Sequence, residues 1–156
     1  MIKTYKIIDC VCRDEFDMEV IARIIDVETN VDMCVVINDH TLQQLSTHVN
    51  GIYDQLRVGD CIKGELFAIY TQQLDSTGNL YFKPRITSDH FKLSTYFEGE
   101  FSVDNVEESG VVVLENPDLN LTIKTGEDDE IDVKTNTVNL SGELYLKTIG
   151  LPFTWL

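Results

Sequence analysis

The residues of this chain that could do acid–base chemistry are few and scattered. Its three histidines are His40, His48 and His90, and no His-x-x-x-His pair occurs. No Gly-x-Ser-x-Gly, phosphate-binding loop or Gly-x-Gly-x-x-Gly sequence is present either. Catalysis needs a nucleophile, base or metal placed beside its helper. These patterns therefore predict a non-enzymatic protein with no catalytic residues, and an enzyme whose site is assembled from distant positions is kept as an alternative.

The four cysteines, Cys10, Cys12, Cys34 and Cys61, all lie in apolar runs. A free cysteine in such a run behaves as a small hydrophobic residue. Cys10 and Cys12 are one strand period apart, whereas zinc sites usually place their cysteine pairs on turns with two to four residues between them. We expect four free thiols, no metal and no cofactor.

Charge is the strongest signal in the sequence. There are 27 acidic residues against 12 basic ones, a net charge of −15. Residues 98–135 hold 12 acids and only Lys124 and Lys134, so this stretch alone carries 2 − 12 = −10. A field of this sign repels nucleic-acid phosphates and anionic lipid and attracts basic surfaces. The residues predicted to bind a protein partner are Glu107, Glu108, Glu127, Asp128, Asp129, Glu130 and Asp132.

Two other interpretations of the densest acidic run, residues 126–132, stay open. Carboxylates are suitable ligands for Ca²⁺, but the run lacks the alternating Asp-x-Asp-x-Asp-Gly spacing of a calcium loop. It could also be a solvated loop that serves only solubility.

An opposite signal comes from cations interleaved with aromatic residues. Proteins that bind single-stranded nucleic acid use cations to follow the phosphates and aromatic faces to stack on the bases. The residues of this alternative site are Arg57, Lys63, Tyr81, Lys83 and Arg85.

Alternating and β-branched residues predict strands over residues 4–12, 16–25, 31–37, 56–70 and 80–86. A helix competes over residues 16–25, because Val20, Ile21, Ile24 and Ile25 also share one helical face. The turn-like residues 28–30 and the β-branched run after them favour a hairpin. A short helix is expected over residues 41–49, and Pro84 places the strand over residues 80–86 at an edge or a bulge.

The stretch Leu56-Arg57-Val58-Gly59-Asp60-Cys61-Ile62-Lys63-Gly64-Glu65-Leu66 and this order of elements resemble an OB-fold. The resemblance implies a five-stranded barrel over residues 4–90 with one short helix between its third and fourth strands. We expect an all-β protein with this OB-like barrel over residues 1–93.

The rest of the chain, residues 94–156, is expected to form an acidic antiparallel β-meander packed on the barrel. Strands are predicted over residues 96–103, 110–114, 119–124, 131–134 and 138–147, with a turn at residues 116–118. A Gly-Glu-apolar triplet recurs at Gly64, Gly99 and Gly142. The unequal spacings between the triplets argue against a true repeat.

Residues 1–9 lack the apolar stretch of a signal peptide, and no run is long enough to span a membrane, so we expect a cytoplasmic protein. In composition the chain is similar to small acidic proteins that neutralise basic nuclease toxins. The first hypothesis is an inhibitor or immunity-type protein that masks a basic protein partner. The alternative is a single-stranded nucleic-acid-binding OB module.

Overall fold

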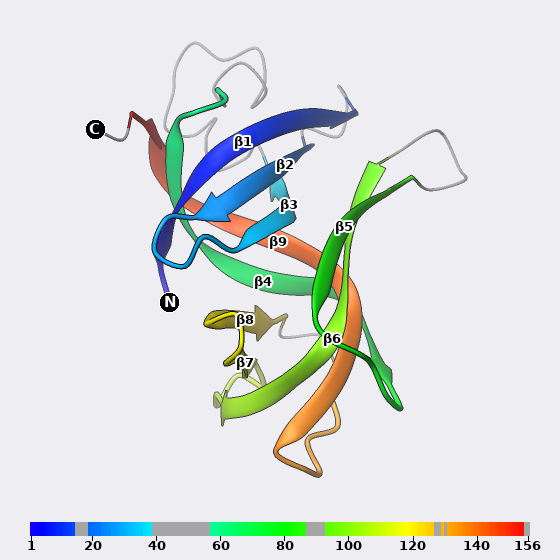
Figure 1. The fold of residues 1–156 in the computed structure, drawn as a ribbon. Coiled ribbons are helices and arrows are strands. Elements are labelled where there is room, and N and C mark those ends of the chain that lie inside the picture. The colour runs from blue at the N-terminus through cyan, green and yellow to red at the C-terminus, as the bar shows by residue number, and fades with distance from the viewer. Residues whose placement is uncertain (15–18, 39–56, 87–92, 127–128, 130, 155–156) are drawn as a thin grey trace.

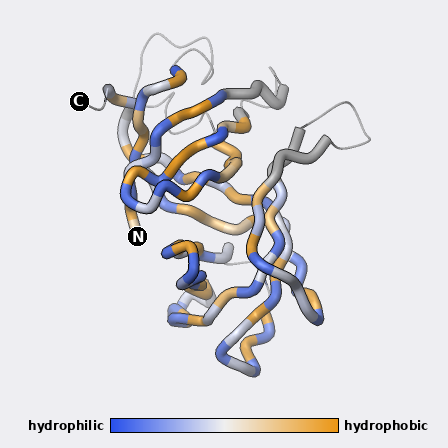
Figure 2. Tube along the Cα trace, viewed as in Figure 1, coloured by the Kyte–Doolittle hydropathy of each residue, from blue (hydrophilic) through white to orange (hydrophobic). Residues whose placement is uncertain are grey.

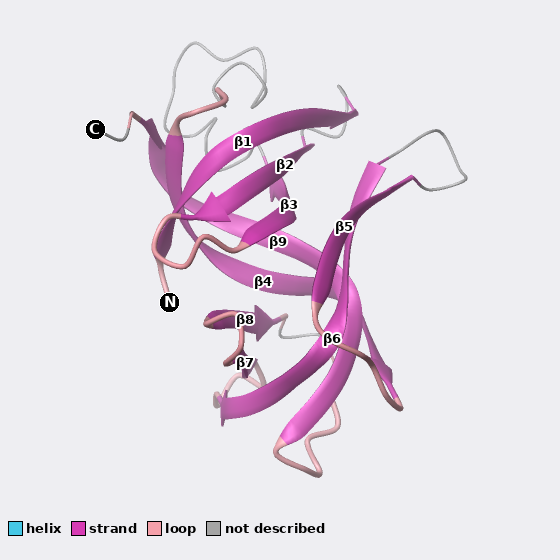
Figure 3. Ribbon diagram, in the orientation of Figure 1, coloured by secondary structure: helices cyan, strands magenta, loops and turns pink. Residues whose placement is uncertain are grey.

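The computed structural model describes residues 1–14, 19–38, 57–86, 93–126, 129 and 131–154. These residues form nine strands and no helix (Figure 3). The strands are β1 (Lys3–Asp14), β2 (Glu19–Asp26), β3 (Asp32–Asn38), β4 (Cys61–Leu74), β5 (Tyr81–Ile86), β6 (Leu93–Val106), β7 (Val112–Asn116), β8 (Leu121–Thr125) and β9 (Thr137–Phe153). The all-β prediction is confirmed, and the helix expected over residues 41–49 lies outside the described residues.

All nine strands belong to one mixed sheet in the order β1-β2-β3-β9-β4-β8-β7-β6-β5. Two further pairings, β1–β4 and β9–β6, close this sheet into two rings. The first ring is β1-β2-β3-β9-β4, and the second ring is β4-β8-β7-β6-β9. Strands β4 and β9 belong to both rings and pass between them (Figure 1).

The shared β4–β9 pair is antiparallel, and its register runs from Cys61 opposite Phe153 to Leu74 opposite Asn139. From Ile62 to Ala68 of β4, buried positions alternate with less buried ones, whereas residues 140–144 of β9 are all buried. Figure 2 shows the hydropathy of both strands along the trace. Leu66, Leu144 and Leu146 are at most 1% exposed. The strands must bend to serve two rings, and the register shifts between Ile69 and Gln72, next to a positive φ of 52° at Tyr70.

The expected barrel over residues 4–90 needs a correction. The ring that contains β1 to β4 is closed by β9, which pairs in parallel with β3 at Val36 and Ile37, and not by the strand over residues 80–86. That strand, β5, pairs with β6 and is the last strand of the sheet. Pro84 cannot donate a ladder hydrogen bond, which restricts β5 to an edge.

A second correction concerns residues 131–134, which are not a strand. The peptide of Asp132 pairs with a side chain instead of a neighbouring strand. Gln73 donates from Nε2 to the Asp132 carbonyl oxygen and accepts from the Asp132 amide, both at 2.9 Å. Ile131 and Val133 still pack against the core, which explains the apolar alternation that suggested a strand.

A buried ion pair joins the first ring to the second. Lys3 Nζ lies 2.9 Å from Asp26 Oδ2, with the two side chains 8% and 1% exposed. The Asp26 carboxylate also accepts from the amides of Glu28 and Thr29, at 2.9 and 3.3 Å. Lys3 Nζ further donates to the carbonyl oxygen of Asn120, in the β7–β8 turn, at 3.2 Å. One ammonium group therefore fixes β1, the β2–β3 turn and the β7–β8 turn together.

We expect Asp26→Ala to lower the free energy of unfolding by about 3–5 kcal/mol, because the substitution leaves Lys3 charged and without its carboxylate in the interior. The control is Asp32→Ala, which removes the exposed ion pair with Arg23 and should cost less than about 1 kcal/mol. Urea denaturation followed by tryptophan fluorescence measures both changes. Equal costs would contradict a linking role for the buried pair.

The pH dependence of stability gives an independent check on Asp26. Burial alone would raise the pKa of this carboxyl, but the bonds from Lys3 and from the two amides outweigh burial and hold the pKa below its ordinary value of 3.8. A depressed folded pKa stabilises the protein above the unfolded value, and this stabilisation is lost as the pH falls through the folded value. The difference in stability between the wild type and Asp26→Asn should be constant above about pH 5 and shrink below about pH 4. A difference independent of pH in that range would show that Asp26 does not titrate as this geometry requires.

Candidate protein-binding surface

The structure brings the described members of the predicted acidic surface to one end of the β7–β8 hairpin. Glu107 and Glu108 lie in the β6–β7 turn, and Asp129 and Asp132 lie in the connection between β8 and β9. The amide of Val112 donates to Thr125 Oγ1 at 2.9 Å, which holds the end of that turn beside the start of the connection. Glu127, Asp128 and Glu130 lie outside the described residues.

Hydrogen bonds hold the acidic connection at two points, one within the connection itself and one on β4. At its start, the Gly126 amide donates to Asp129 Oδ2 and the Asp129 amide donates to the Gly126 carbonyl oxygen, both at 3.2 Å. Farther along the connection, Gln73 near the end of β4 binds the backbone amide and carbonyl of Asp132. These bonds reduce the entropy that a partner would have to remove on binding.

Both cations of residues 98–135 are engaged inside the chain. Lys124 Nζ lies 2.8 Å from Glu65 Oε1 and 3.4 Å from Glu107 Oε1, and Lys134 lies 3.3 Å from Asp132. The hydrogen bond with Glu65 raises the pKa of Lys124. Burial opposes ionisation of Glu65, but Lys124 and the amino terminus outweigh burial and lower the pKa of this carboxyl.

Other carboxylates of this region have no cation beside them. Within the described part of residues 98–135, seven acidic side chains make no ion pair: Glu98, Glu100, Asp104, Glu108, Glu115, Asp118 and Asp129. Glu100 and Asp104 are exposed on β6, and Glu115 is on β7 opposite Ser102 of β6. The excess negative charge of the sequence is therefore displayed on the second ring.

The residues of the nucleic-acid alternative are not brought together. Arg57 and Lys63 lie before and within the first-ring part of β4, and Lys63 Nζ lies 5.8 Å from the centre of the Phe153 ring. Tyr81, Lys83 and Arg85 lie on β5, which pairs with the second ring (Figure 1). Tyr81 donates its hydroxyl hydrogen to Glu98 at 2.6 Å, and this bond raises the pKa of Tyr81 to about 12. The side chains of Lys83 and Arg85 lie outside the described part.

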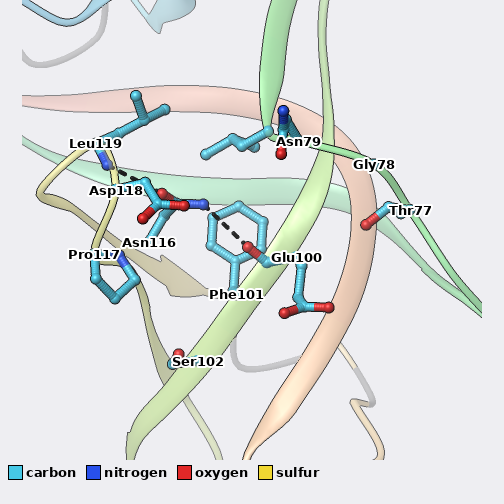
Figure 4. A pocket seen from close by; sticks show the side chains of 11 residues that line it. Thr77, Gly78, Asn79, Glu100, Phe101, Ser102, Asn116, Pro117, Asp118 and Leu119 are labelled. Atoms are coloured by element: carbon cyan, nitrogen blue, oxygen red, sulfur yellow. Dashed lines mark hydrogen bonds between the residues drawn. The ribbon is translucent and has the colours of Figure 1, made fainter.

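A cleft between the two rings was not anticipated from the sequence. It has two lobes, of about 520 and 620 Å³, which share Leu80, Asp118 and Leu119 in their walls. Figure 4 shows the first lobe, with Asp118 and Glu100 on either side of the Phe101 ring in that view. Asp32 and Asn120 line the second lobe.

Local contacts hold the walls of this cleft in place. Asn116 Nδ2 donates to the Glu100 carbonyl oxygen, and the Leu119 amide donates to Asn116 Oδ1, both at 3.1 Å. A Cβ on Gly99 would lie 2.6 Å from the Leu80 Cα, so the glycine is what allows Leu80 to reach β6. The turn at residues 116–118 was predictable, but its approach to Glu100 was not, because the two are adjacent only in the folded sheet.

The prediction of free thiols concerns only Cys34 and Cys61 in the described structure, and both are free. Burial raises the pKa of each thiol above its usual value of 9.0. The side chains of Cys10 and Cys12 lie outside the described residues. In the part of the chain that is described, no group of three or more His, Cys, Asp or Glu residues could hold a metal ion.

None of the described segments includes a helix long and apolar enough to cross a membrane. Comparison of the chain with protein-family models, with curated proteins and with solved structures finds no match. The function must therefore be inferred from the surface itself.

Replacing Gly99 tests how the cleft wall is built. We expect Gly99→Ala to destabilise the protein by about 1–3 kcal/mol, because the added methyl group collides with the Leu80 backbone. The matched control is Gly78→Ala, where a Cβ meets nothing within 4 Å and the change should stay within about 0.5 kcal/mol. Thermal unfolding compares the two. A neutral Gly99→Ala would mean that Leu80 does not rest on β6.

Proposed function

We propose that the first ring is an OB-type barrel whose fourth and fifth strands are β4 and β9. In support, the ring has five strands, and its last strand lies between the third and the fourth. Residues 75–136 are then an insertion between the fourth and fifth strands. OB domains use the loop at this position, together with the face of strands two and three, to bind ligands.

We further propose that the chain is a non-enzymatic binding protein that docks a basic protein partner against its acidic second ring. The observation that carries this proposal is that the cations of this region are paired within the chain while several of its carboxylates are not. Lys124 and Lys134 are already paired, while carboxylates such as Glu108 and Asp104 have no cation near them within the described chain. Repulsion among such carboxylates is relieved when external cations bind, and the field also speeds the encounter with a basic partner.

The runner-up, binding of single-stranded nucleic acid, requires a cationic and aromatic face on the first ring. The exposed guanidinium of Arg23 on β2 is already bonded to Asp32 on β3. The acidic insertion also opposes the approach of phosphates. The protein partner is therefore the better supported of the two.

The test compares two triple variants that remove the same charge. The surface variant is Glu107→Gln, Glu108→Gln and Asp132→Asn, and the control variant is Glu28→Gln, Asp60→Asn and Asp75→Asn. Each protein is immobilised and used to capture basic proteins from a cell extract, and the captured partner is then purified for kinetic measurements. The surface variant should lower the association rate constant about tenfold at low salt, and the control variant much less.

The difference between the variants should also shrink above about 0.15 M salt, where charges are screened within about 8 Å. Association that slows equally in both variants would contradict a defined acidic surface. Recovery of a nucleic acid, with binding unaffected by the surface variant, would favour the runner-up.

A further inference from the structure

The inter-ring cleft carries an inference of its own. We propose that it binds an arginine side chain in an extended segment of the basic partner. This inference rests on the proposed function for the partner being a protein. The cleft and the acidic turn lie at opposite ends of the β7–β8 hairpin, about five residues or roughly 17 Å apart, so the two sites can be tested separately.

The size of the cleft suits a short piece of chain. Its lobes of about 520 and 620 Å³ fall in the range of roughly 300–1,000 Å³ that is typical of ligand sites. The shared wall residues Leu80, Asp118 and Leu119 make the two lobes direct neighbours. A segment can therefore place one side chain in the first lobe while its backbone continues through the second.

Part of the cleft wall is apolar. Leu80, Phe82 and Leu119 are partly buried and pack against the core, and Phe101 beneath the first lobe is 1% exposed. Arginine has a hydrocarbon stem that packs on such a surface while its charged end stays at a polar rim. A wholly polar ligand would leave this apolar part of the wall uncovered.

The rim supplies acceptors and negative charge. Glu100 and Asp118 line the first lobe and make no ion pair within the described chain. No lysine or arginine is among the residues that line either lobe. Two described cations contact residues of the second lobe and are engaged there, Lys3 with Asp26 and the Asn120 carbonyl oxygen and Arg23 with Asp32.

The number of acceptors favours arginine over lysine. Glu100 and Asp118 each present two carboxylate oxygens, and Asn79 and Ser102 add side-chain oxygens to the same lobe (Figure 4). A guanidinium group has five donors in a fixed plane, whereas an ammonium group has three around one point. Several spaced acceptors are therefore better satisfied by arginine.

The rim is already fixed before any ligand arrives. Asn116 bridges Glu100 and Leu119 by two hydrogen bonds, and Thr77 Oγ1 lies 2.7 Å from Asn139 Oδ1 of β9. Lys3 holds the turn that carries Asn120. A site built in this way binds without first ordering its own walls.

The experiment is a titration of the full-length, isotope-labelled protein with capped Ala-Arg-Ala-Arg-Ala, followed by amide chemical shifts at low salt. The peptide should shift the amides of Leu80, Phe101 and Leu119 in a saturable way. The cleft variant Glu100→Gln/Asp118→Asn should weaken binding at least about tenfold, because two charge-assisted contacts are lost. The control variant Asp60→Asn/Asp75→Asn removes the same charge outside the lobes and should change the affinity less than about twofold.

Four further outcomes would overturn the assignment. Equal weakening by the cleft and control variants would show a general field effect. Tight binding of the same peptide with citrulline in place of both arginines would show that charge is not recognised. A lysine peptide that binds as tightly would contradict the choice of arginine. Shifts confined to Glu107, Glu108 and Asp132 would refute arginine binding in the cleft but would be consistent with the proposed acidic surface. The dispersion of the amide spectrum reports whether each variant is folded.

Discussion

The pairing of β4 with β9 is the constraint on which the rest of this structure depends. Each ring needs both strands, which together form a two-stranded ribbon. The buried residues of both rings form one hydrophobic cluster along this β4–β9 ribbon. Two strands of 14 and 17 residues can serve two rings only if they bend. A Cβ at Gly142, where β9 crosses β4, would lie 2.9 Å from the Ile69 carbonyl oxygen. The close approach of the two strands therefore requires this glycine, and the bend coincides with the nearby bulge. Because β9 follows every other described strand in the sequence, neither ring can close before β9 is in place.

The same arrangement determines where charge and space are found. The β7–β8 hairpin lies beside the ribbon, with acidic residues at both of its ends. At one end, Lys124 links Glu65 of the ribbon to Glu107 of the β6–β7 turn. At the other end, Lys3 links Asp26 to the turn at Asn120, and the cleft between the rings lies beside this contact. Cations of the chain are thus used to join the two rings, and the carboxylates left over are the ones available to a partner.

Local sequence pattern was sufficient to predict most of the strands. It could not predict which strands pair when they lie far apart in the sequence. Alternation and turn residues were sufficient for the β2–β3 hairpin and for the turn at residues 116–118. No local pattern reveals that β9 pairs with β3, because these strands are about a hundred residues apart. The Gly-Glu-apolar triplets are informative only afterwards, since Gly64, Gly99 and Gly142 each occupy a position where a Cβ would collide with a neighbour. From the sequence, acidic residues could be grouped only by their order in the chain. The sequence therefore contained no sign that Glu100 and Asp118 line the same cleft.

Native-state hydrogen exchange of the amides in β4 and β9 tests most directly whether the shared ribbon holds both rings. If it does, the amides of Leu66, Leu144 and Leu146 exchange only through global unfolding and are the slowest in the protein. The opening free energies of β1–β3 and β6–β8 should then be equal to or below that value. Exchange of β9 at a free energy well below that of β1–β3, with the first-ring hairpins still protected, would contradict the claim that both rings depend on this pair of strands.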